Sequence, residues 1–230
     1  MYKGWRIGVV IPALDEEEAI AHVITDIPEW VDEIIVADNG SCDRTAEIAE
    51  HAGALIVHES ERGYGAACQA GIGALKAADI VVFLDGDYSD HPGEMLALVD
   101  PIAASRADFV VGSRVTGDAA RGALTPQQRF GNWLACRLIR RFWGVVYTDL
   151  GPFRAIQRDA LAGLNMTDRK YGWTVEMQIK AAKAGLKYLE VPVSYRPRIG
   201  TSKISGTLRG SLRAGSSILG LIARSALHSH

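Results

Sequence analysis

Two carboxylates separated by one glycine, Asp85 and Asp87, directly follow the apolar run Val81–Leu84. A short run rich in β-branched and aromatic residues predicts a strand buried on both faces. Open α/β sheets bind ligands beyond the carboxyl ends of their strands, which is where these carboxylates fall. A divalent cation shared with a diphosphate would remove the repulsion between them. Judged by spacing alone, these residues could equally form a solvated acidic turn that binds no metal ion.

The charges of the chain are divided between its two halves. Residues 1–100 carry 5 Lys and Arg against 20 Asp and Glu, whereas residues 101–230 carry 20 against 7. This division favours an acidic half that uses a metal ion and a basic half that meets anions, such as phosphates, lipid head groups or nucleic acid. The alternative is a chain whose two halves merely neutralise each other.

Composition favours a folded cytoplasmic protein. Apolar residues make up 48% of the 230 and charged residues 23%, which excludes a disordered chain. No apolar run approaches the roughly 18 residues needed to span a bilayer, and the N-terminus lacks the apolar stretch of a signal peptide. The three cysteines lack metal-ligand spacing and fit reduced thiols. We expect a cytoplasmic protein that can also rest on the inner face of the membrane.

Strands and helices alternate over the first 115 residues, which predicts a mostly parallel, right-handed, doubly wound sheet. The predicted strands are Arg6–Ile11, Glu33–Ala37, Ala54–His58, Ile80–Leu84 and Phe109–Gly112. The predicted helices are Glu16–Asp26, capped by Asp15, then Asp43–Ala52, Tyr64–Ala77 and Pro92–Ala104. After Arg114 the sequence predicts a helix at Gln127–Phe142, an extended stretch at Tyr147–Ala155, a helix at Thr174–Ala184 and a strand at Tyr188–Val193.

Two common nucleotide-binding folds are excluded by the order of the motifs. A dinucleotide-binding domain carries GxGxxG directly after its first strand, but here that strand is followed by Pro12–Glu16. The glycine-rich loop Arg62–Gly65 comes after the third strand, and no Walker A sequence is present. The chain is therefore neither such a dehydrogenase nor a P-loop NTPase.

The first half resembles the GT-A glycosyltransferases of family 2. Four blocks occur in that family's order: its opening strand with an acidic helix start, its DDGSxDxT motif, its glycine-containing third block and its DxD metal motif. In this chain they are Val9–Glu16, Ile35–Thr45, Arg62–Ala67 with Gly71, and Asp85–Asp87. The resemblance implies an α/β GT-A fold, a Rossmann-like, mostly parallel open sheet with flanking helices.

The second half narrows the resemblance to polyprenol-phosphate sugar synthases of the dolichyl-phosphate mannose synthase type. The matching segments are Phe109–Arg114, Arg129–Asn132, Asp149–Arg154, Tyr171–Met177 and Arg198–Lys203. The third of these is one residue shorter than the family's commonest form. The resemblance implies an inverting, metal-dependent transfer of a sugar from a UDP- or GDP-linked donor to a polyprenyl phosphate of the dolichyl or undecaprenyl type.

The resemblance places the donor in the first half. Pro12, Leu14 and Glu16 would border the base, and Asp38 would accept hydrogen bonds from the base or the ribose. The alternative for Asp38, together with Ser41, is simple capping of the next helix.

The metal motif would hold Mg²⁺ or Mn²⁺ against the donor. Asp87 is the expected direct ligand, whereas Asp85 lies nearer the ribose or a metal-bound water, with Gly86 beside the nucleotide. The cation would act as a Lewis acid on the departing diphosphate. Relatives often carry Gln where this chain has Ser89, so water can fill that coordination place.

The second half supplies the expected phosphate ligands and the catalytic carboxylates. Arg114, Arg129, Arg198 and Lys203 can bind phosphate oxygens, and each could instead be a surface cation. Asp149 is the expected base or acceptor-orienting group, although a phosphate nucleophile is already ionised and needs no strong base. Glu176 is the second candidate for this catalytic role. Alternatively, it is a structural carboxylate in the first turn of its helix, where the helix dipole favours negative charge.

The tail carries a possible membrane contact, in a chain that we otherwise expect to form one domain. We expect a single glycosyltransferase domain at residues 1–205, with a nucleotide-sugar and metal half at 1–115 and an acceptor half at 116–205. The amphipathic segment 206–230 either lies on an anionic membrane or packs on the domain or on a second copy in a homodimer. Its apolar stripe is Leu208, Leu212, Gly215, Leu219 and Ile222.

Three other functions compete with transfer to a lipid phosphate. The same donor chemistry could serve a soluble hydroxyl acceptor, or the chain could be a catalytically silent nucleotide-sugar-binding module. Nucleic-acid binding would leave the acidic motif unused, so we expect no nucleic-acid partner.

Overall fold

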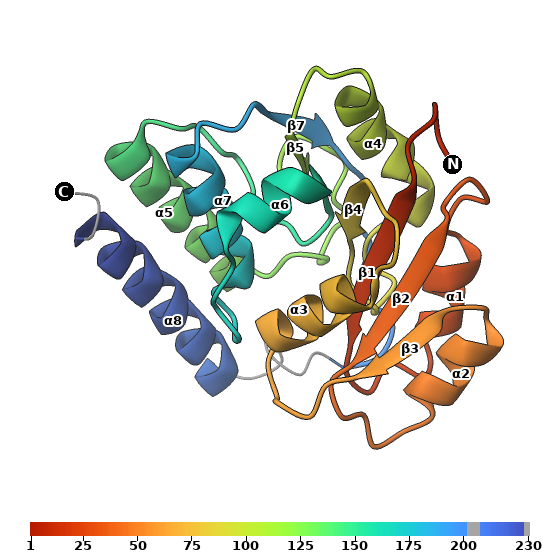
Figure 1. Cartoon of the computed structure of the whole chain (residues 1–230). Coiled ribbons are helices and arrows are strands. Elements are labelled where there is room, and N and C mark those ends of the chain that lie inside the picture. Colours follow the sequence, from red (N-terminus) through yellow and green to blue (C-terminus); the bar gives the residue numbers. More distant parts are fainter. Residues whose placement is uncertain (202–207, 228–230) are drawn as a thin grey trace.

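Seven strands form one mixed sheet in the order β3-β2-β1-β4-β6-β5-β7 (Figure 1). This computed structural model describes the backbone of residues 1–201 and 208–227, and the side chains of 1–201 and 215–227. β3, β2, β1 and β4 run parallel, as do β5 and β7, so the predicted mostly parallel α/β sheet is confirmed. The strands are β1 Ile7–Ala13, β2 Glu33–Asp38, β3 Leu55–His58, β4 Ile80–Phe83, β5 Phe109–Ser113, β6 Arg154–Gln157 and β7 Tyr188–Pro192.

The carboxyl ends of the parallel strands meet at one edge of the sheet. Ala13 at the end of β1 is paired with Asp38 at the end of β2, and Val10 of β1 is paired with Phe83 at the end of β4. All four residues of β4 are buried because both faces of the sheet are covered. The turn at Asp85–Asp87 therefore leaves the sheet beside β1, at the edge where open α/β folds bind ligands.

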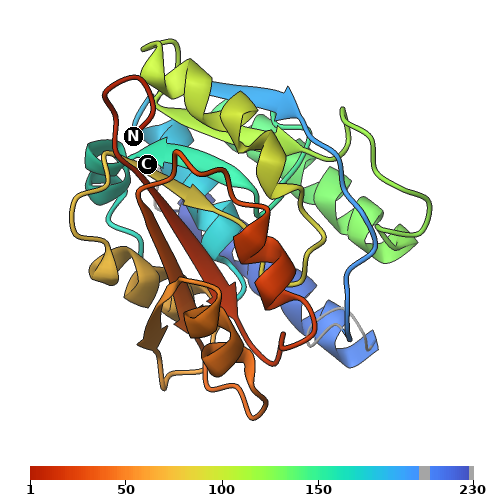
Figure 2. The same ribbon diagram turned by 90° about the vertical axis from the view of Figure 1, so that its right-hand side faces the viewer.

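Helices cover both faces of the sheet, and Figure 2 faces the layer formed by α1, α2 and α4. The other face carries α3, α6 and α7, where the rings of Phe83 and Trp173 meet edge to face. α5 and α8 pack against α7 and each other around Ile139 and Ile222. The helices are α1 Ile20–Thr25, α2 Thr45–His51, α3 Tyr64–Ala74, α4 Met95–Ala103 after the 3-10 turn Pro92–Glu94, α5 Pro126–Trp143, α6 Arg158–Leu164, α7 Trp173–Lys183 and α8 Leu208–Leu227.

The segment before β6 differs from the prediction. The sequence predicts an extended stretch at Tyr147–Ala155, whereas the strand begins at Arg154 and runs antiparallel between β4 and β5. The sequence does not predict α6, which follows at once. This helix has seven residues and buries only Leu161 and Leu164, so its periodic signal is weak.

Helix α1 begins four residues later than the sequence predicts, and Asp15 does not cap it. Asp15 has a φ of 51°, and its carboxylate accepts a hydrogen bond from the Cys42 N–H at 2.7 Å. The Glu16 N–H donates to Thr45 Oγ1 at 2.7 Å. Contacts with the loop after β2 thus keep Asp15 and Glu16 in a loop, at the edge of the sheet where the carboxyl ends of the parallel strands meet.

The described side chains of the tail are partly packed on the protein. Leu221 and Ile222 of α8 are buried against α5 and α7, whereas Leu219 is 40% exposed. Within the apolar stripe, protein packing therefore takes Ile222 and leaves Leu219 accessible. The side chains of Leu208 and Leu212 lie outside the described residues. Among the helices that the structure describes, none is long and apolar enough to cross a bilayer.

Glycine lets α3 lie directly against the loop before α7. A Cβ at Gly65 would lie 2.0 Å from the carbonyl oxygen of Asp168. The N–H groups of Gly65 and Ala66 donate to the carbonyls of Lys170 and Arg169. These bonds satisfy amides that the first turn of a helix leaves unpaired, so α3 and residues 168–170 form one packed unit beside the ligand edge.

Replacing Gly65 with alanine should separate this unit. We expect Gly65→Ala to lower the free energy of unfolding by about 1–3 kcal/mol, because no rotamer change can relieve a clash with a backbone carbonyl. Gly73→Ala in the same helix is the matched control: its Cβ would meet nothing within 4 Å, and it should raise stability by up to ~1 kcal/mol. Urea denaturation measures both variants, and equal stabilities would contradict the packing.

Candidate active site

A cavity of about 680 Å³ opens at the carboxyl edge of the sheet. Its lining comes from the segments that follow β1, β2, β3 and β4 and from segments that follow β5 and β7. Eight of the residues singled out from the sequence line it: Pro12, Leu14, Glu16, Asp85, Gly86, Asp87, Arg114 and Arg198. The structure thus brings the acidic motif and two of the expected phosphate ligands to one place.

Other expected site residues lie elsewhere. Asp38, Arg129, Asp149 and Glu176 are not among the residues that line the cavity. Arg129 is exposed on α5, and the other three are buried carboxylates with hydrogen-bond partners. Lys203 lies outside the described residues.

Asp85 and Asp87 are held by their own neighbours. The Tyr64 hydroxyl donates to Asp85 Oδ1 at 3.0 Å, and the Ser89 N–H donates to Asp87 Oδ1 at 2.9 Å. Burial, and then the charge of Asp87, raise the pKa of Asp85 to about 7. A nearby cation would remove this repulsion and favour the ionised carboxylates.

Asp90 is a third carboxylate here that was not predicted from the sequence. It is 1% exposed, its Oδ2 accepts a hydrogen bond from the Asp85 N–H at 3.4 Å, and its Oδ1 has no hydrogen-bond partner among the described residues. Burial, and then the charge of Asp85, raise the pKa of Asp90 well above its ordinary value. Two buried carboxyl groups, Asp87 and Asp90, and the partly buried Asp85 within six residues make this turn strongly attractive to positive charge.

A divalent cation fits the chemistry of this turn only with help from a ligand. Asp85 and Asp87 offer the hard oxygen donors that Mg²⁺ and Mn²⁺ prefer, and both line the cavity. Within the described residues, no group of three or more His, Cys, Asp and Glu side chains is arranged to hold a metal ion. The remaining coordination places would therefore belong to a diphosphate and water.

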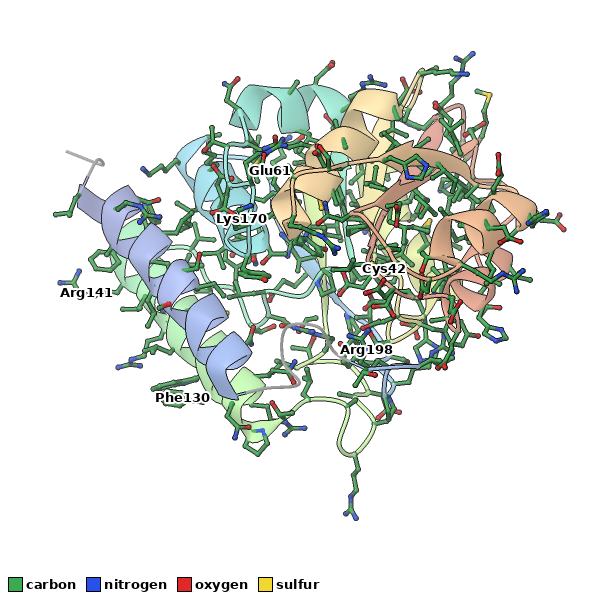
Figure 3. The ribbon with its side chains drawn as sticks, turned by 90° about the horizontal axis from the view of Figure 1, so that it is seen from below. Cys42, Glu61, Phe130, Arg141, Lys170 and Arg198 are labelled. Atoms are coloured by element: carbon green, nitrogen blue, oxygen red, sulfur yellow. The ribbon has the colours of Figure 1, made fainter. Side chains whose placement is uncertain are left out.

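Arg198 supplies positive charge to this turn from the segment after β7 (Figure 3). Its Nη1 lies 3.3 Å from Asp87 Oδ2, and its Nη2 donates to Glu16 Oε1 at 2.5 Å. The Ile199 N–H also donates to the Asp87 carbonyl at 3.0 Å. The guanidinium thus joins the first and last parts of the cavity wall and neutralises the carboxylate expected to bind metal.

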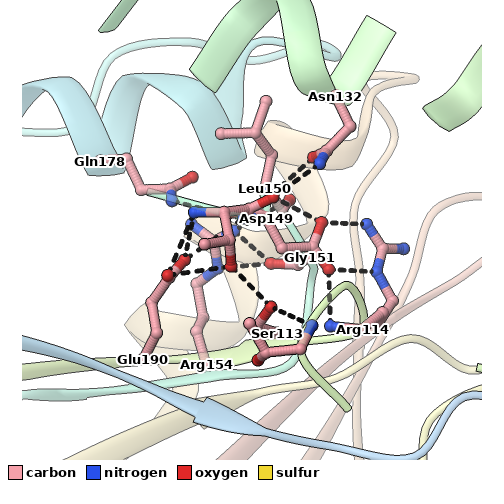
Figure 4. A network of polar contacts seen from close by, with 11 residues as sticks. Ser113, Arg114, Asn132, Asp149, Leu150, Gly151, Arg154, Gln178 and Glu190 are labelled. Atoms are coloured by element: carbon pink, nitrogen blue, oxygen red, sulfur yellow. Dashed lines mark hydrogen bonds and ion pairs between the residues drawn. The ribbon is translucent and has the colours of Figure 1, made fainter. Parts of the chain in front are cut away.

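Arg114 is the most firmly fixed cation of the cavity (Figure 4). Its Nε and Nη2 donate to Oδ2 and Oδ1 of Asp149, each at 2.8 Å, and its backbone N–H donates to the same Oδ2. The guanidinium carbon lies 4.9 Å from the centre of the Tyr195 ring. Although burial acts in the opposite direction, the bonds to Asp149 raise the pKa of Arg114.

A polar network holds Asp149 in turn (Figure 4). The Asp149 N–H donates to Glu190 of β7 at 3.2 Å, and its carbonyl accepts from Gln178 of α7 at 2.9 Å. The Leu150 N–H donates to both Asp149 Oδ1 and Asn132 Oδ1 of α5. Both carboxylate oxygens of Asp149 are therefore engaged, and the carboxylate holds the Arg114 guanidinium in place at the cavity.

Glu176 also has a local task instead of the expected catalytic one. It accepts hydrogen bonds from the N–H groups of Thr167 and Asp168 and lies 2.9 Å from Lys180 Nζ. Burial alone would raise the pKa of Glu176, but the Thr167 hydroxyl and these donors lower it overall. The carboxylate fixes the loop that packs on α3.

The loop after β2 contributes Asn39, a cavity residue that was not predicted from the sequence. Asp38 accepts hydrogen bonds from the Ser41 N–H and pairs with His58, each at 3.1 Å. Asn39, its neighbour, lines the cavity and binds the carbonyls of Glu59 and Glu61. The DDGS motif, in which Asn39 replaces the second Asp, was the available signal. Three further cavity residues, Arg62, Tyr64 and Tyr171, lie within recognised blocks that we did not resolve into individual roles.

A model of glycosyl transferase family 2 matches residues 8–164. The chain belongs to this family. It is 37% identical over 213 residues to an uncharacterised glycosyltransferase of Mycobacterium tuberculosis, with 92% of this chain and 95% of that one covered. It is 33% identical over 220 residues to a dolichyl-phosphate hexose transferase of Haloferax volcanii, with 93% and 92% covered.

A solved structure shares the whole architecture of this family 2 chain. Glucosyl-3-phosphoglycerate synthase from Mycobacterium tuberculosis, in complex with Mn²⁺, UDP-glucose and phosphoglyceric acid, superposes with a TM-score of 0.78 and 25% identity. The match covers 97% of this chain and 80% of that one. The comparisons confirm the predicted GT-A fold and the predicted glycosyltransferase activity. One relative is named for dolichyl phosphate, and the solved structure contains phosphoglyceric acid.

Removing Arg198 should make the turn at Asp85–Asp87, called the metal turn below, more attractive to a cation. We expect Arg198→Ala to tighten Mn²⁺ binding to the nucleotide-free protein by a factor on the order of ten, because Asp87 loses its competing guanidinium. Electron paramagnetic resonance of free Mn²⁺ measures the affinity. Arg62→Ala, which removes another cavity arginine, is the control and should change it less. Weaker Mn²⁺ binding to Arg198→Ala would show that Arg198 does not compete for this place.

The role of Glu176 predicts a pH-dependent loss of stability. Its pKa is lower in the folded protein than in the unfolded chain, so its ionised form stabilises the fold above the unfolded value near 4.5. This contribution disappears as the pH falls through the lower, folded value. Glu176→Gln should therefore be less stable than the wild type at pH 7, and the difference should shrink in acid. Urea denaturation at several pH values tests this, and a difference that does not change with pH would contradict it.

Proposed function

We propose that this family 2 enzyme transfers a sugar from a UDP- or GDP-linked donor to a polyprenyl phosphate, with inversion at the anomeric carbon. Asp85, Asp87 and the cavity residues around them would hold the nucleotide diphosphate. Mg²⁺ or Mn²⁺ at Asp87 would supply Lewis-acid stabilisation of the departing diphosphate. Arg114 would bind and orient the acceptor phosphate on the opposite wall.

The observation that carries the choice of a phosphate acceptor is the engagement of Asp149 by Arg114. A hydroxyl acceptor needs a base to take its proton, whereas a phosphate oxygen is already ionised near pH 7. Among the described residues, the carboxylates that line the cavity are Glu16, Asp85 and Asp87. Glu16 is bound to Arg198 and the other two belong to the metal turn, so the cavity offers a fixed cation and no spare base.

The positive wall suits a phosphate monoester. The Arg114 fork is oriented by two parallel bonds to one carboxylate and by the Tyr195 ring, which reduces the entropy lost when it binds an anion. Arg198 on the neighbouring segment can turn from Asp87 to a phosphate oxygen once a metal ion takes over that carboxylate. Donor binding and the rearrangement of Arg198 would then be coupled.

A soluble phosphorylated acceptor is the second candidate. It is favoured by the similarity to the glucosyl-3-phosphoglycerate synthase solved with phosphoglyceric acid. The same arginines could bind the phosphate of such a molecule. The two candidates differ in what lies beyond that phosphate.

A direct comparison of acceptors tests the proposal. The full chain is incubated with Mn²⁺, UDP- and GDP-linked hexoses, and either a short-chain polyprenyl phosphate in detergent or phosphoglyceric acid. We expect a glycosyl phosphate product of inverted anomeric configuration with the polyprenyl phosphate only, detected by mass spectrometry and NMR. Product formed only on phosphoglyceric acid would overturn the proposal in favour of the soluble acceptor.

The role of Asp149 can be separated from that of a base. We expect Asp149→Asn to lower kcat/KM for the acceptor by a factor on the order of 100, because the Arg114 fork is misplaced. Arg114→Lys should have a similar effect, since lysine cannot reproduce the bidentate geometry. The pH profile of the residual activity should keep the shape of the wild-type profile. Loss of its acidic limb in Asp149→Asn would identify Asp149 as a base after all.

A further inference from the structure

The outer face of α5 combines exposed aromatic rings with arginines. The side chains of Phe130 and Trp133 are 62% and 55% exposed, and their ring centroids lie 5.9 Å apart. The Arg137 guanidinium lies 5.8 Å from the centre of the Trp133 ring. Single exposed apolar residues are ordinary on protein surfaces, whereas a contiguous pair of large rings indicates a contact site.

This face is uniformly basic. Arg129, Arg137, Arg140 and Arg141 are exposed, and α5 contains no Asp or Glu. Figure 3 shows Phe130 and Arg141 near opposite ends of the helix, at the rim of the molecule away from the sheet. With 3.6 residues per turn, the four arginines and two rings occupy about a third of the helix circumference. The face therefore combines apolar area with positive charge along its full length.

The rings are exposed although α5 already has a packed core side. Ala135, Cys136 and Ile139 on that opposite side are buried against α7 and α8. A helix that buries one stripe in its own domain normally presents polar side chains on the other. Phe130 and Trp133 depart from that pattern, so the fold itself does not account for them.

The position of α5 connects this face with the cavity. Thr125 caps the helix and Gln128 completes its capping box, and both residues line the cavity. Phe130 follows within one helical turn. The N-terminal end of the outer face therefore lies within one helical turn of the cavity wall, although Gln128 itself points from another side of the helix.

We propose that Arg129, Phe130, Trp133, Arg137, Arg140 and Arg141 form a surface that docks on an anionic lipid membrane. This inference rests on the proposed function, because a polyprenyl phosphate resides in a bilayer. Aromatic rings enter the head-group region, while arginines bind lipid phosphates and bury their stems along the acyl boundary. Charge complementarity favours this partner over a second copy of the chain, whose identical face would place arginine against arginine.

Binding of the full chain to vesicles tests the surface without any substrate. The wild type should bind vesicles of phosphatidylcholine with phosphatidylglycerol, bind phosphatidylcholine alone much more weakly, and dissociate at high salt. Arg137→Glu should weaken the partitioning by a factor on the order of ten, since it replaces a cationic side chain that anionic lipids attract with one that they repel. Arg137→Lys, which keeps the charge, is the matched control and should bind nearly as the wild type does.

The aromatic pair is tested separately. Phe130→Ser with Trp133→Ser should weaken partitioning at least about tenfold through lost apolar burial, whereas Leu96→Ser, at a 44% exposed leucine of α4, should not. Brominated lipids should quench tryptophan fluorescence in the wild type and less in Trp133→Phe. Unchanged binding of both α5 variants would overturn the proposal. So would wild-type protein that forms a dimer through this face, or binds nucleic acid with it, without binding vesicles.

These results are distinguishable from a failure of the proposed function. If the chain binds vesicles through α5 but does not transfer sugar to a polyprenyl phosphate in detergent, the acceptor assignment is wrong and the docking surface stands. If it transfers sugar in detergent but does not bind vesicles, the docking surface is wrong and the acceptor assignment stands. When both hold, Arg137→Glu should lower transfer to a vesicle-borne acceptor and leave transfer in detergent unchanged.

Discussion

The ion pair between Asp149 and Arg114 fixes the basic wall of the active site. Asp149 is 1% exposed, and a carboxylate so buried is tolerated only when donors satisfy both oxygens. Those donors come from Arg114 and Leu150, while Asn132, Gln178 and Glu190 hold the backbone on either side. Residues after β5, on α5, on α7 and on β7 thus meet around one charge, and the guanidinium that lines the cavity is rigid because of them.

The opposite wall has the reverse electrostatic character. Asp87 and Asp90 are buried beside the partly buried Asp85, and burial together with mutual repulsion raises the pKa of Asp85 and Asp90. Arg198 reaches across to Asp87 and Glu16, so its guanidinium offsets part of the negative charge of this wall. A donor diphosphate with its cation would replace the contact with Asp87 and leave Arg198 for a phosphate oxygen. This exchange gives the enzyme a physical reason to bind donor and acceptor in a coupled way.

Much of the fold could be predicted from the sequence, but the roles of individual residues could be predicted less often. The run Val81–Phe83 is apolar throughout because its strand is covered on both faces, so its position and the edge at which Asp85 lies were both readable. Asp149 and Glu176 show the limit of such reading. A motif identifies a carboxylate but not the donors that surround it. Asp149 is bound by Arg114, which is 35 residues away in the sequence, and Glu176 is bound by Thr167, which belongs to no recognised motif. The outer face of α5 was missed because its helix was read for Arg129 alone. For the tail, the sequence predicted an apolar stripe but not which of its residues would pack on the protein: Ile222 is buried, whereas Leu219 is exposed.

A donor diphosphate and Asp87 would share one divalent cation in this cavity. Electron–nuclear double resonance on Mn²⁺ bound to the full chain with UDP or GDP tests this sharing, because phosphorus coupling appears only when a phosphate oxygen binds the ion. We expect strong phosphorus coupling from protein-bound Mn²⁺ in the wild type and loss of that protein-bound signal in Asp87→Ala. The same protein-bound signal in Asp87→Ala, or bound Mn²⁺ without phosphorus coupling in the wild type, would contradict it.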